Sequence, residues 1–127
     1  WHYGNDARAL ADDERAGFEV FQRSGCPTCH TVGADFAAFT DNSFRNTGVE
    51  WSRRHGTLGP VKVTPDEGRF EVTGHERDRR AFRVPSLRNV GLTAPYMHDG
   101  SLATLADVVD WYDAGAGQDP IRDPALQ

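Results

Sequence analysis

One short segment constrains this chain more than any other feature of its sequence. Cys26 and Cys29 are the only two cysteines, they lie three positions apart, and His30 follows directly. This Cys-x-x-Cys-His spacing matches the pattern by which two thiols bind the two vinyl groups at one edge of a porphyrin. The adjacent histidine then lies beneath the iron as its proximal ligand. The segment therefore predicts one covalently attached haem c, around which the chain must fold.

Two other chemistries use paired cysteines, and the surrounding sequence favours neither. A structural zinc site takes four ligands, and the sequence contains no second cysteine pair. A redox-active dithiol is typical of a strand-to-helix junction, and that context is absent here. Haem attachment is therefore the interpretation that we carry forward.

The composition agrees with a chain built around a cofactor. Hydrophobic residues make up 38% of the 127 residues, which is few for one small domain whose core is made of protein alone. A buried porphyrin would supply the missing apolar interior. The formal charge of -5 argues against a nucleic-acid surface. No apolar run is long enough to span a bilayer. The chain begins at Trp1 without a visible signal peptide, so we expect a processed or trimmed terminus.

The first predicted helix leads directly into the cysteine motif. Asp12 or Asp13 is expected to cap it, and the helix should end near Ser24 with Gly25 as its stop. Gly17 is expected to allow the close approach of another segment. The apolar residues that fall near one face of this helix are Ala16, Val20 and Phe21.

The second predicted helix covers Leu105–Asp113. Thr104 and Asp107 resemble a capping box in which Asp replaces the usual Glu, and glycines at 115 and 117 end the helix. One apolar stripe at helical spacing consists of Leu105, Val108, Val109 and Tyr112. Residues 31–80 show no sustained period and are predicted to be long loops with short turns. Residues 85–100 are also predicted to be loop, with a short helix near Leu87–Val90.

The sixth ligand of the iron is open at this level. Met is the frequent partner of His in c-type cytochromes, and Met97 is the only methionine. Tyr112 lies on the apolar stripe of the last helix, although most tyrosines in such a position are ordinary core residues. Periodicity alone does not favour the tyrosine. The remaining candidates are His2, His55, His75 and His98.

Several segments in fixed order carry a more specific resemblance. They are Gly25–Thr31, Phe39–Gly48, Phe82–Val90, Leu92–Gly100 and Thr104–Leu105. This series resembles the C-terminal haem domain of the bacterial dihaem cytochrome c peroxidase family, which includes the MauG enzymes. The resemblance implies a mainly α, cytochrome c-like haem domain with long loops. Residues 1–127 would form this single domain, equivalent to one half of such an enzyme and trimmed at both ends.

The resemblance also assigns ligands. In this family the distal ligand of the C-terminal haem follows the His of His-Asp-Gly by fourteen residues, which leads from His98 to Tyr112. Met97 then becomes a loop residue. A tyrosinate ligand is anionic and lowers the reduction potential relative to Met. The family places a calcium ion between its two haems, with backbone carbonyls that correspond to Thr93 and Pro95.

Other polar residues receive lesser roles. Arg83 and Arg88 are candidates for neutralising the haem propionates. His98 and Asp99 are expected to organise their loop by hydrogen bonds near the haem edge. His75 and the cluster Arg77–Arg80 are interpreted as a polar surface loop.

The function that follows is electron transfer within a dihaem peroxidase or MauG-like oxidoreductase. The sequence contains only one haem motif, so a second haem domain or subunit and an electron-donor protein are the expected partners. With Tyr112 on the iron, the site is closed to peroxide, and the isolated domain should relay electrons without a catalytic residue of its own. Covalent haem attachment predicts a periplasmic location. The alternatives are a stand-alone monohaem carrier, a cytochrome subunit of a larger redox complex, or a subunit that keeps haem only for stability.

Overall fold

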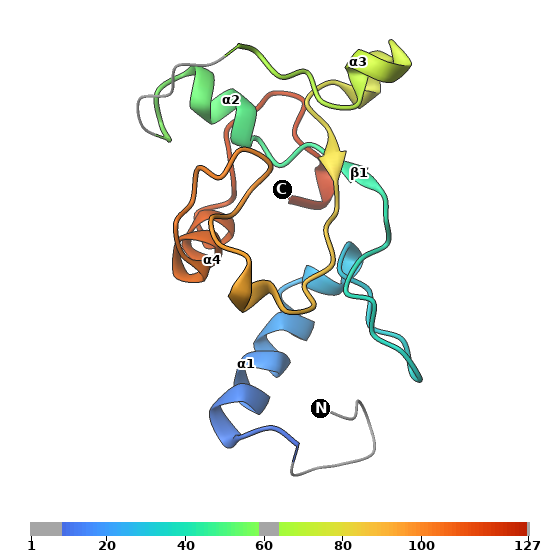
Figure 1. Ribbon diagram of the computed structural model, residues 1–127, viewed down its shortest axis with the longest axis vertical. Helices are drawn as coiled ribbons and strands as arrows, with labels where there is room; N and C mark the ends of the chain where they lie inside the picture. Colours follow the sequence, from blue (N-terminus) through green and yellow to red (C-terminus); the bar gives the residue numbers. More distant parts are fainter. Residues whose placement is uncertain (1–8, 59–63, 127) are drawn as a thin grey trace. The chain divides into compact units, whose positions relative to one another are not determined.

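The chain divides into two compact units, shown in a computed structural model that describes residues 9–58 and 64–126 (Figure 1). Among the described residues, the first unit comprises residues 9–43 and 84–88, and the second comprises residues 44–58, 64–83 and 89–126. The cysteine motif belongs to the first unit, and the predicted helix with Tyr112 belongs to the second.

Helix α1, Asp12–Arg23, leads into the motif and ends as predicted. Its N-cap is Ala11, whose backbone N–H donates to Glu14 Oε2 at 2.8 Å. The prediction of an aspartate cap was therefore wrong by one residue. The carboxylates of Asp12 and Asp13 instead lie within the first turn, where they stabilise the positive end of the helix dipole.

Two glycines before the cysteine motif, Gly17 within α1 and Gly25 after it, differ in their surroundings. Gly25 has a φ of 78°, the left-handed conformation that ends a helix and that glycine adopts without strain. Gly17 was expected to allow a close approach, yet no described atom lies within 4 Å of where its Cβ would be. That expectation was wrong, because this part of α1 contacts no other segment closely.

The rest of the first unit is a pair of extended segments held by long-range hydrogen bonds. Val84 N–H donates to Ser43 O at 2.9 Å, and Thr40 Oγ1 donates to Val84 O at 2.7 Å. Ser86 Oγ donates to the carbonyl of residue 38 at 2.7 Å. The segment at 84–88 therefore lies along the chain that returns after the motif.

The second unit contains short elements connected by loops. They are β1 (Phe44–Arg45), α2 (Val49–Arg54), α3 (Phe70–Thr73), β2 (Phe82–Arg83) and α4 (Leu105–Asp113), with 3-10 turns at Glu76–Asp78, Val90–Leu92 and Pro124–Leu126. The two strands pair antiparallel, with Phe44 opposite Arg83. Helix α4 has the predicted bounds. Its capping box is also confirmed, since Asp107 N–H donates to Thr104 Oγ1 at 3.1 Å and Thr104 N–H donates to Asp107 Oδ2 at 2.8 Å.

Two loop predictions need correction. The segment at 31–80 contains α2 and α3 in addition to turns. These helices have six and four residues, too short to show a helical period in the sequence. The short helix expected near Leu87–Val90 is a 3-10 turn at Val90–Leu92. Helices and loops dominate the described residues, and the one sheet in them has two strands of two residues each.

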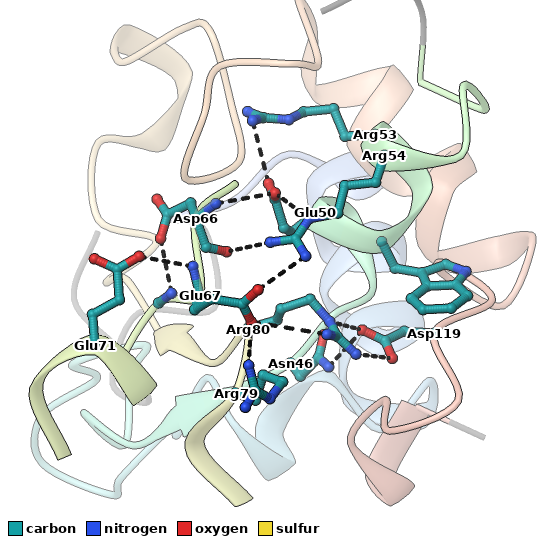
Figure 2. A network of polar contacts seen from close by, with 12 residues as sticks. Asn46, Glu50, Arg53, Arg54, Asp66, Glu67, Glu71, Arg79, Arg80 and Asp119 are labelled. Atoms are coloured by element: carbon teal, nitrogen blue, oxygen red, sulfur yellow. Dashed lines mark hydrogen bonds and ion pairs between the residues drawn. The ribbon is translucent and has the colours of Figure 1, made fainter. Parts of the chain in front are cut away.

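Among the described residues, buried polar residues are as numerous as buried apolar ones. The buried apolar residues among those described are all small: Ala37, Val49, Ala81, Val84 and Ala116. The buried polar residues are Asn46, Glu50, Ser52, Arg80 and Asp119, and all five belong to the second unit. Figure 2 shows the polar network to which Asn46, Glu50, Arg80 and Asp119 belong. Arg80 donates to both carboxylate oxygens of Asp119, at 2.7 and 2.9 Å, and Asn46 Nδ2 donates to Asp119 at 2.8 Å.

Arg80 therefore corrects the interpretation of residues 77–80 as a surface loop. Its guanidinium lies beside a carboxylate that is 0% exposed, from a residue 39 positions away in the sequence. Arg79 joins the same network, donating to Glu67 Oε2 at 3.2 Å (Figure 2). The sequence alone does not indicate which arginines of such a cluster form ion pairs with acidic residues far away along the chain.

Candidate haem-binding site

The cysteine motif forms one tight turn. Cys26–Thr28 is a 3-10 turn that follows α1 through Gly25. The N–H groups of Cys29 and His30 both donate to the carbonyl of Cys26, at 3.3 and 2.9 Å. Neither cysteine forms a disulfide, and both are partly exposed. The turn thus holds the two thiols and the imidazole on five consecutive residues, within reach of one edge of a porphyrin.

The direction in which the pKa of Cys26 is shifted does not favour a redox-active dithiol. Burial raises the pKa of Cys26 above the ordinary value of 9.0, and a weaker backbone hydrogen bond opposes that effect. Reactive dithiols depend on a lowered pKa, because the thiolate is the nucleophile. The described residues also contain no group of three or more potential metal ligands of the kind a zinc site needs. Haem attachment remains the chemistry that fits.

The orientation of His30 is a further sign of metal ligation. Its Nδ1 lies 2.9 Å from the carbonyl oxygen of Phe39. With the proton on Nδ1 as donor, Nε2 presents its lone pair to a metal. Iron- and zinc-binding histidines commonly hold their second nitrogen in this way, and the contact raises the basicity of the ligand.

The carbonyl that holds His30 is itself positioned by the returning chain. Phe39 N–H donates to Thr31 O at 3.0 Å, and Asp41 N–H donates to Cys29 O at 2.8 Å. Thr31 Oγ1 adds a bond of 2.8 Å to the carbonyl of residue 40. The sequence prediction missed this role of Phe39. The contact joins positions nine apart through a backbone atom, so no side-chain pattern indicated it.

Each unit contains a helix whose apolar residues are exposed. Helix α1 and helix α4 each contain no buried residue. Within the first unit, Val20 is 54% exposed. Within the second unit, Leu105, Val109 and Tyr112 are 38%, 65% and 40% exposed. Amphipathic helices normally bury such a stripe, and a porphyrin is an apolar group that can cover one.

The two candidates for the distal ligand both belong to the second unit. Met97 has a φ of 69° in a closed turn, where Tyr96 and Leu102 exchange hydrogen bonds of 2.7 and 3.4 Å. Tyr112 lies on α4, one position before its last residue. Ligation by either side chain stays a prediction. Among the histidines, His55 stacks on Trp51 at 4.0 Å and His75 lies on the surface, whereas His2 is outside the described residues.

The remaining predicted site residues are those proposed for calcium and for the haem propionates. Thr93 follows the 3-10 turn and its Oγ1 donates to Val90 O at 3.1 Å, and Pro95 follows a cis peptide bond. Arg88 Nη1 donates to Ala37 O at 3.0 Å within the first unit. Arg83 lies exposed on β2. No contact described here tests the calcium or propionate roles.

Asp99 organises its loop by hydrogen bonds, whereas His98 contributes a ring stack, and a position near a haem edge stays a prediction for both. Asp99 Oδ1 accepts from Ser101 N–H at 3.0 Å, and its other oxygen accepts from Arg53 at 3.0 Å. Burial alone would raise the pKa of Asp99, but hydrogen bonds from Ser101 and Arg53 outweigh that effect and lower it. His98 stacks on Phe82, with ring centroids 3.6 Å apart.

Comparisons with known proteins confirm the resemblance. The chain is 41% identical over 106 residues to the cytochrome c551 peroxidase of Nitrosomonas europaea, which covers 83% of this chain and 28% of the peroxidase. It is 36% identical over 121 residues to the methylamine utilization protein MauG of Methylorubrum extorquens, which covers 94% of this chain and 30% of MauG. No family model matches the chain.

A solved structure supports the same relation. A MauG-like protein associated with microbial copper homeostasis matches with a TM-score of 0.68 and 33% identity, over 92% of this chain and 41% of that protein. No helix in the described residues has the length and apolar character needed to cross a bilayer. The chain spans less than half of the length of these relatives, and they match most of its own length. It is therefore a homologue of the cytochrome c peroxidases and MauG, a family whose cofactor is c-type haem.

Proposed function

We propose that this chain binds one haem c and serves as the electron-transfer domain of a dihaem cytochrome c peroxidase or MauG-like oxidoreductase. The observation that carries the proposal is the motif turn, which presents two thiols beside an imidazole whose Nδ1 is held by Phe39. Residues 1–127 would act as one haem domain. Since the chain spans 28% and 30% of the two curated relatives, peroxide chemistry and the second haem are assigned to a further domain or subunit.

The chain's own residues supply attachment and orientation. Haem contributes one-electron chemistry at its iron. Cys26 and Cys29 would anchor it, and His30 would ligate the iron through Nε2. The hydrogen bond from Nδ1 to the Phe39 carbonyl would increase the electron donation of His30 and so lower the reduction potential.

Tyr112 is the proposed distal ligand in preference to Met97. The resemblance leads to position 112, and the apolar stripe around it on α4 is exposed, which is a surface that a porphyrin could cover. Met97 lies in a turn closed by backbone hydrogen bonds between its neighbours, which suits a loop residue. A tyrosinate would close the iron to peroxide, so that the domain passes electrons or shares oxidising equivalents.

Secondary roles follow the same resemblance. Arg83 and Arg88 would neutralise haem propionates, and the carbonyls of Thr93 and Pro95 would help to bind calcium. An electron-donor protein is the proposed redox partner. Covalent haem attachment outside the cytoplasm makes the bacterial periplasm the proposed location.

The test counts haems and turnover on one sample. The assembled protein is purified after expression with haem-attachment machinery, and haem per particle is measured together with peroxide consumption. Two haems per particle with turnover support the proposal. One haem and no turnover indicate a stand-alone carrier or a cytochrome subunit. Tyr112→Phe should change the ferric spectrum and raise the potential, whereas Met97→Leu should leave both unchanged. The reverse pattern assigns Met97.

A further inference from the structure

Helix α2 contacts the chain on both sides of α4. Its last turn contains Arg53, which binds the loop that enters α4, and its N-cap, Gly48, contacts the chain that leaves α4. All of these residues lie in the second unit, where Figure 1 shows α2 and α4.

The contact at the entry to α4 is an ion pair removed from water. Arg53 Nη1 donates to Asp99 Oδ2 at 3.0 Å, and the two side chains are only 7% and 6% exposed. Arg53 Nη2 lies 3.3 Å from Glu50 Oε2, and the Glu50 side chain is 0% exposed (Figure 2). His98 Nε2 lies 3.9 Å from the same oxygen. Two consecutive residues of the loop thus face two residues of α2.

This pair is poorly suited to stabilisation alone. Arg53 Nε has no hydrogen-bond partner among the described residues, so protein groups satisfy the buried guanidinium only in part. Burying two charges costs several kcal/mol, and buried ion pairs that are incompletely hydrogen-bonded add little net stability. Their better-attested use is to specify one arrangement among several. The geometry is therefore that of a positioning contact.

The ion pair is connected to α4 by a short continuous set of contacts. Asp99 Oδ1 accepts from Ser101 N–H at 3.0 Å, and Leu102 pairs with Tyr96 through two backbone hydrogen bonds. Thr104 follows two residues later and caps α4 through its reciprocal bonds with Asp107. The ion pair therefore anchors the loop that leads directly into the first turn of α4.

The contact at the exit from α4 depends on two glycines. A Cβ built on Gly48 would lie 2.7 Å from the Cα of Gly117, and one built on Gly117 would overlap the Gly48 carbonyl and reach 2.6 Å from Ser52 Oγ. Gly117 N–H also donates to Thr47 O at 3.3 Å. Backbones approach this closely only where neither residue has a side chain.

We propose that α2 is a brace that fixes α4 at both ends, and that Arg53 is a positioning residue for Tyr112. The inference rests on the proposed role of Tyr112 as distal ligand. It goes further by naming what holds that ligand in place. Tyr112 lies between the two fixed points, seven residues into α4 and five residues before Gly117.

The test compares adjacent arginines of α2. Arg53→Met removes the contact with Asp99. Arg54→Met is the matched control, because Arg54 also pairs with Glu50, at 2.8 Å, yet its other ion pair is with Glu67 and not with the loop. In the haem-loaded protein, Arg53→Met should lose most of the tyrosinate-ligated ferric signal, Arg54→Met should keep it, and Arg53→Lys should partly restore it.

A second readout does not require haem ligation. Amide hydrogen exchange should show lost protection in α4 for Arg53→Met and retained protection for Arg54→Met. Gly117→Ala should also reduce protection in α4, whereas Gly91→Ala should not, because no described atom lies within 4 Å of a Cβ at position 91. Unchanged protection in both Arg53→Met and Gly117→Ala overturns the brace.

The two proposals fail separately. If Tyr112→Phe leaves the ferric spectrum unchanged, ligation by Tyr112 is wrong, and hydrogen exchange still decides whether α2 fixes α4. If Tyr112→Phe changes the spectrum but Arg53→Met matches Arg54→Met in both readouts, the positioning role of Arg53 is wrong while the proposed function stands.

Discussion

The two units hold themselves together in different ways. The first unit relies on backbone hydrogen bonds around the motif turn, and it leaves Val20 and Phe36 54% and 65% exposed. The second unit buries a connected set of ion pairs, in which the side chains of Glu50 and Asp119 are 0% exposed. The first unit contains the proposed covalent anchor of the haem, whereas the buried ion pairs of the second unit are formed by its own side chains. We therefore expect loss of the thiols to act first near the motif turn and loss of a buried charge to act first on the ion-pair network.

The largest expected effect tests the first unit. Replacing both thiols, in the variant Cys26→Ala/Cys29→Ala, should abolish covalent haem attachment, because no other residue in the motif can form a thioether. Haem absorbance after denaturation and extraction measures the result. Hydrogen exchange on the same sample should show protection lost in α1 and largely retained around Asp119. Equal losses in both units would contradict the comparison.

The next effect tests the second unit. Asp119→Ala should lower the free energy of unfolding by about 3–5 kcal/mol, because it leaves the Arg80 guanidinium buried without its bidentate partner. Asp123→Ala is the control, since the Arg45–Asp123 pair is 30% and 15% exposed and should contribute about 0–1 kcal/mol. Chemical denaturation followed by circular dichroism measures both. A similar small loss for the two variants would show that burial of the pair is unimportant.

Acid should weaken the ion pairs of the second unit. Burial alone would raise the pKa of Asp119, but hydrogen bonds from Arg80 and Asn46 outweigh it and hold the pKa below the ordinary 3.8. The pKa of Glu67 is likewise lowered from 4.5, because hydrogen bonds from Arg54 and Arg79 outweigh its burial. The folded state thus binds fewer protons than the unfolded state.

The sign of the pH dependence follows directly. The contribution of both carboxylates is present above about pH 4.5 and is lost as the pH falls through their folded-state pKa values. Denaturation curves between about pH 7 and pH 3 should show a falling free energy of unfolding, with Asp119→Ala less sensitive than the parent protein. Stability that is constant or rises toward acid would contradict this account.

The smallest effect concerns the start of α4. Thr104→Ala removes the side chain that accepts from Asp107 N–H at 3.1 Å and should cost about 1 kcal/mol. Thr104→Ser keeps the hydroxyl and should behave like the parent protein. Thermal unfolding of the three proteins measures the difference. Equal destabilisation by Ala and Ser would assign the effect to the lost methyl group and not to the cap.

Features that depend on neighbouring residues followed from sequence. The bounds of α4 and its capping box were predicted correctly, because Thr104 and Asp107 are three positions apart and the helical period is visible over nine residues. The haem motif is equally local, since all of its chemistry lies within Cys26–His30. Helices α2 and α3 were missed because neither is long enough to display a period.

The amino-acid sequence was sufficient to predict covalent haem attachment and to identify the family to which the chain is homologous. Tertiary structure alone decided which of many similar charges became interior: Arg80 meets Asp119 across 39 positions and Arg53 meets Asp99 across 46. It also decided that a backbone carbonyl orients His30. The physical reason is that an ion pair or a carbonyl contact depends on where the chain returns in space, and a run of arginines and acids looks the same in sequence whether or not it finds a buried partner.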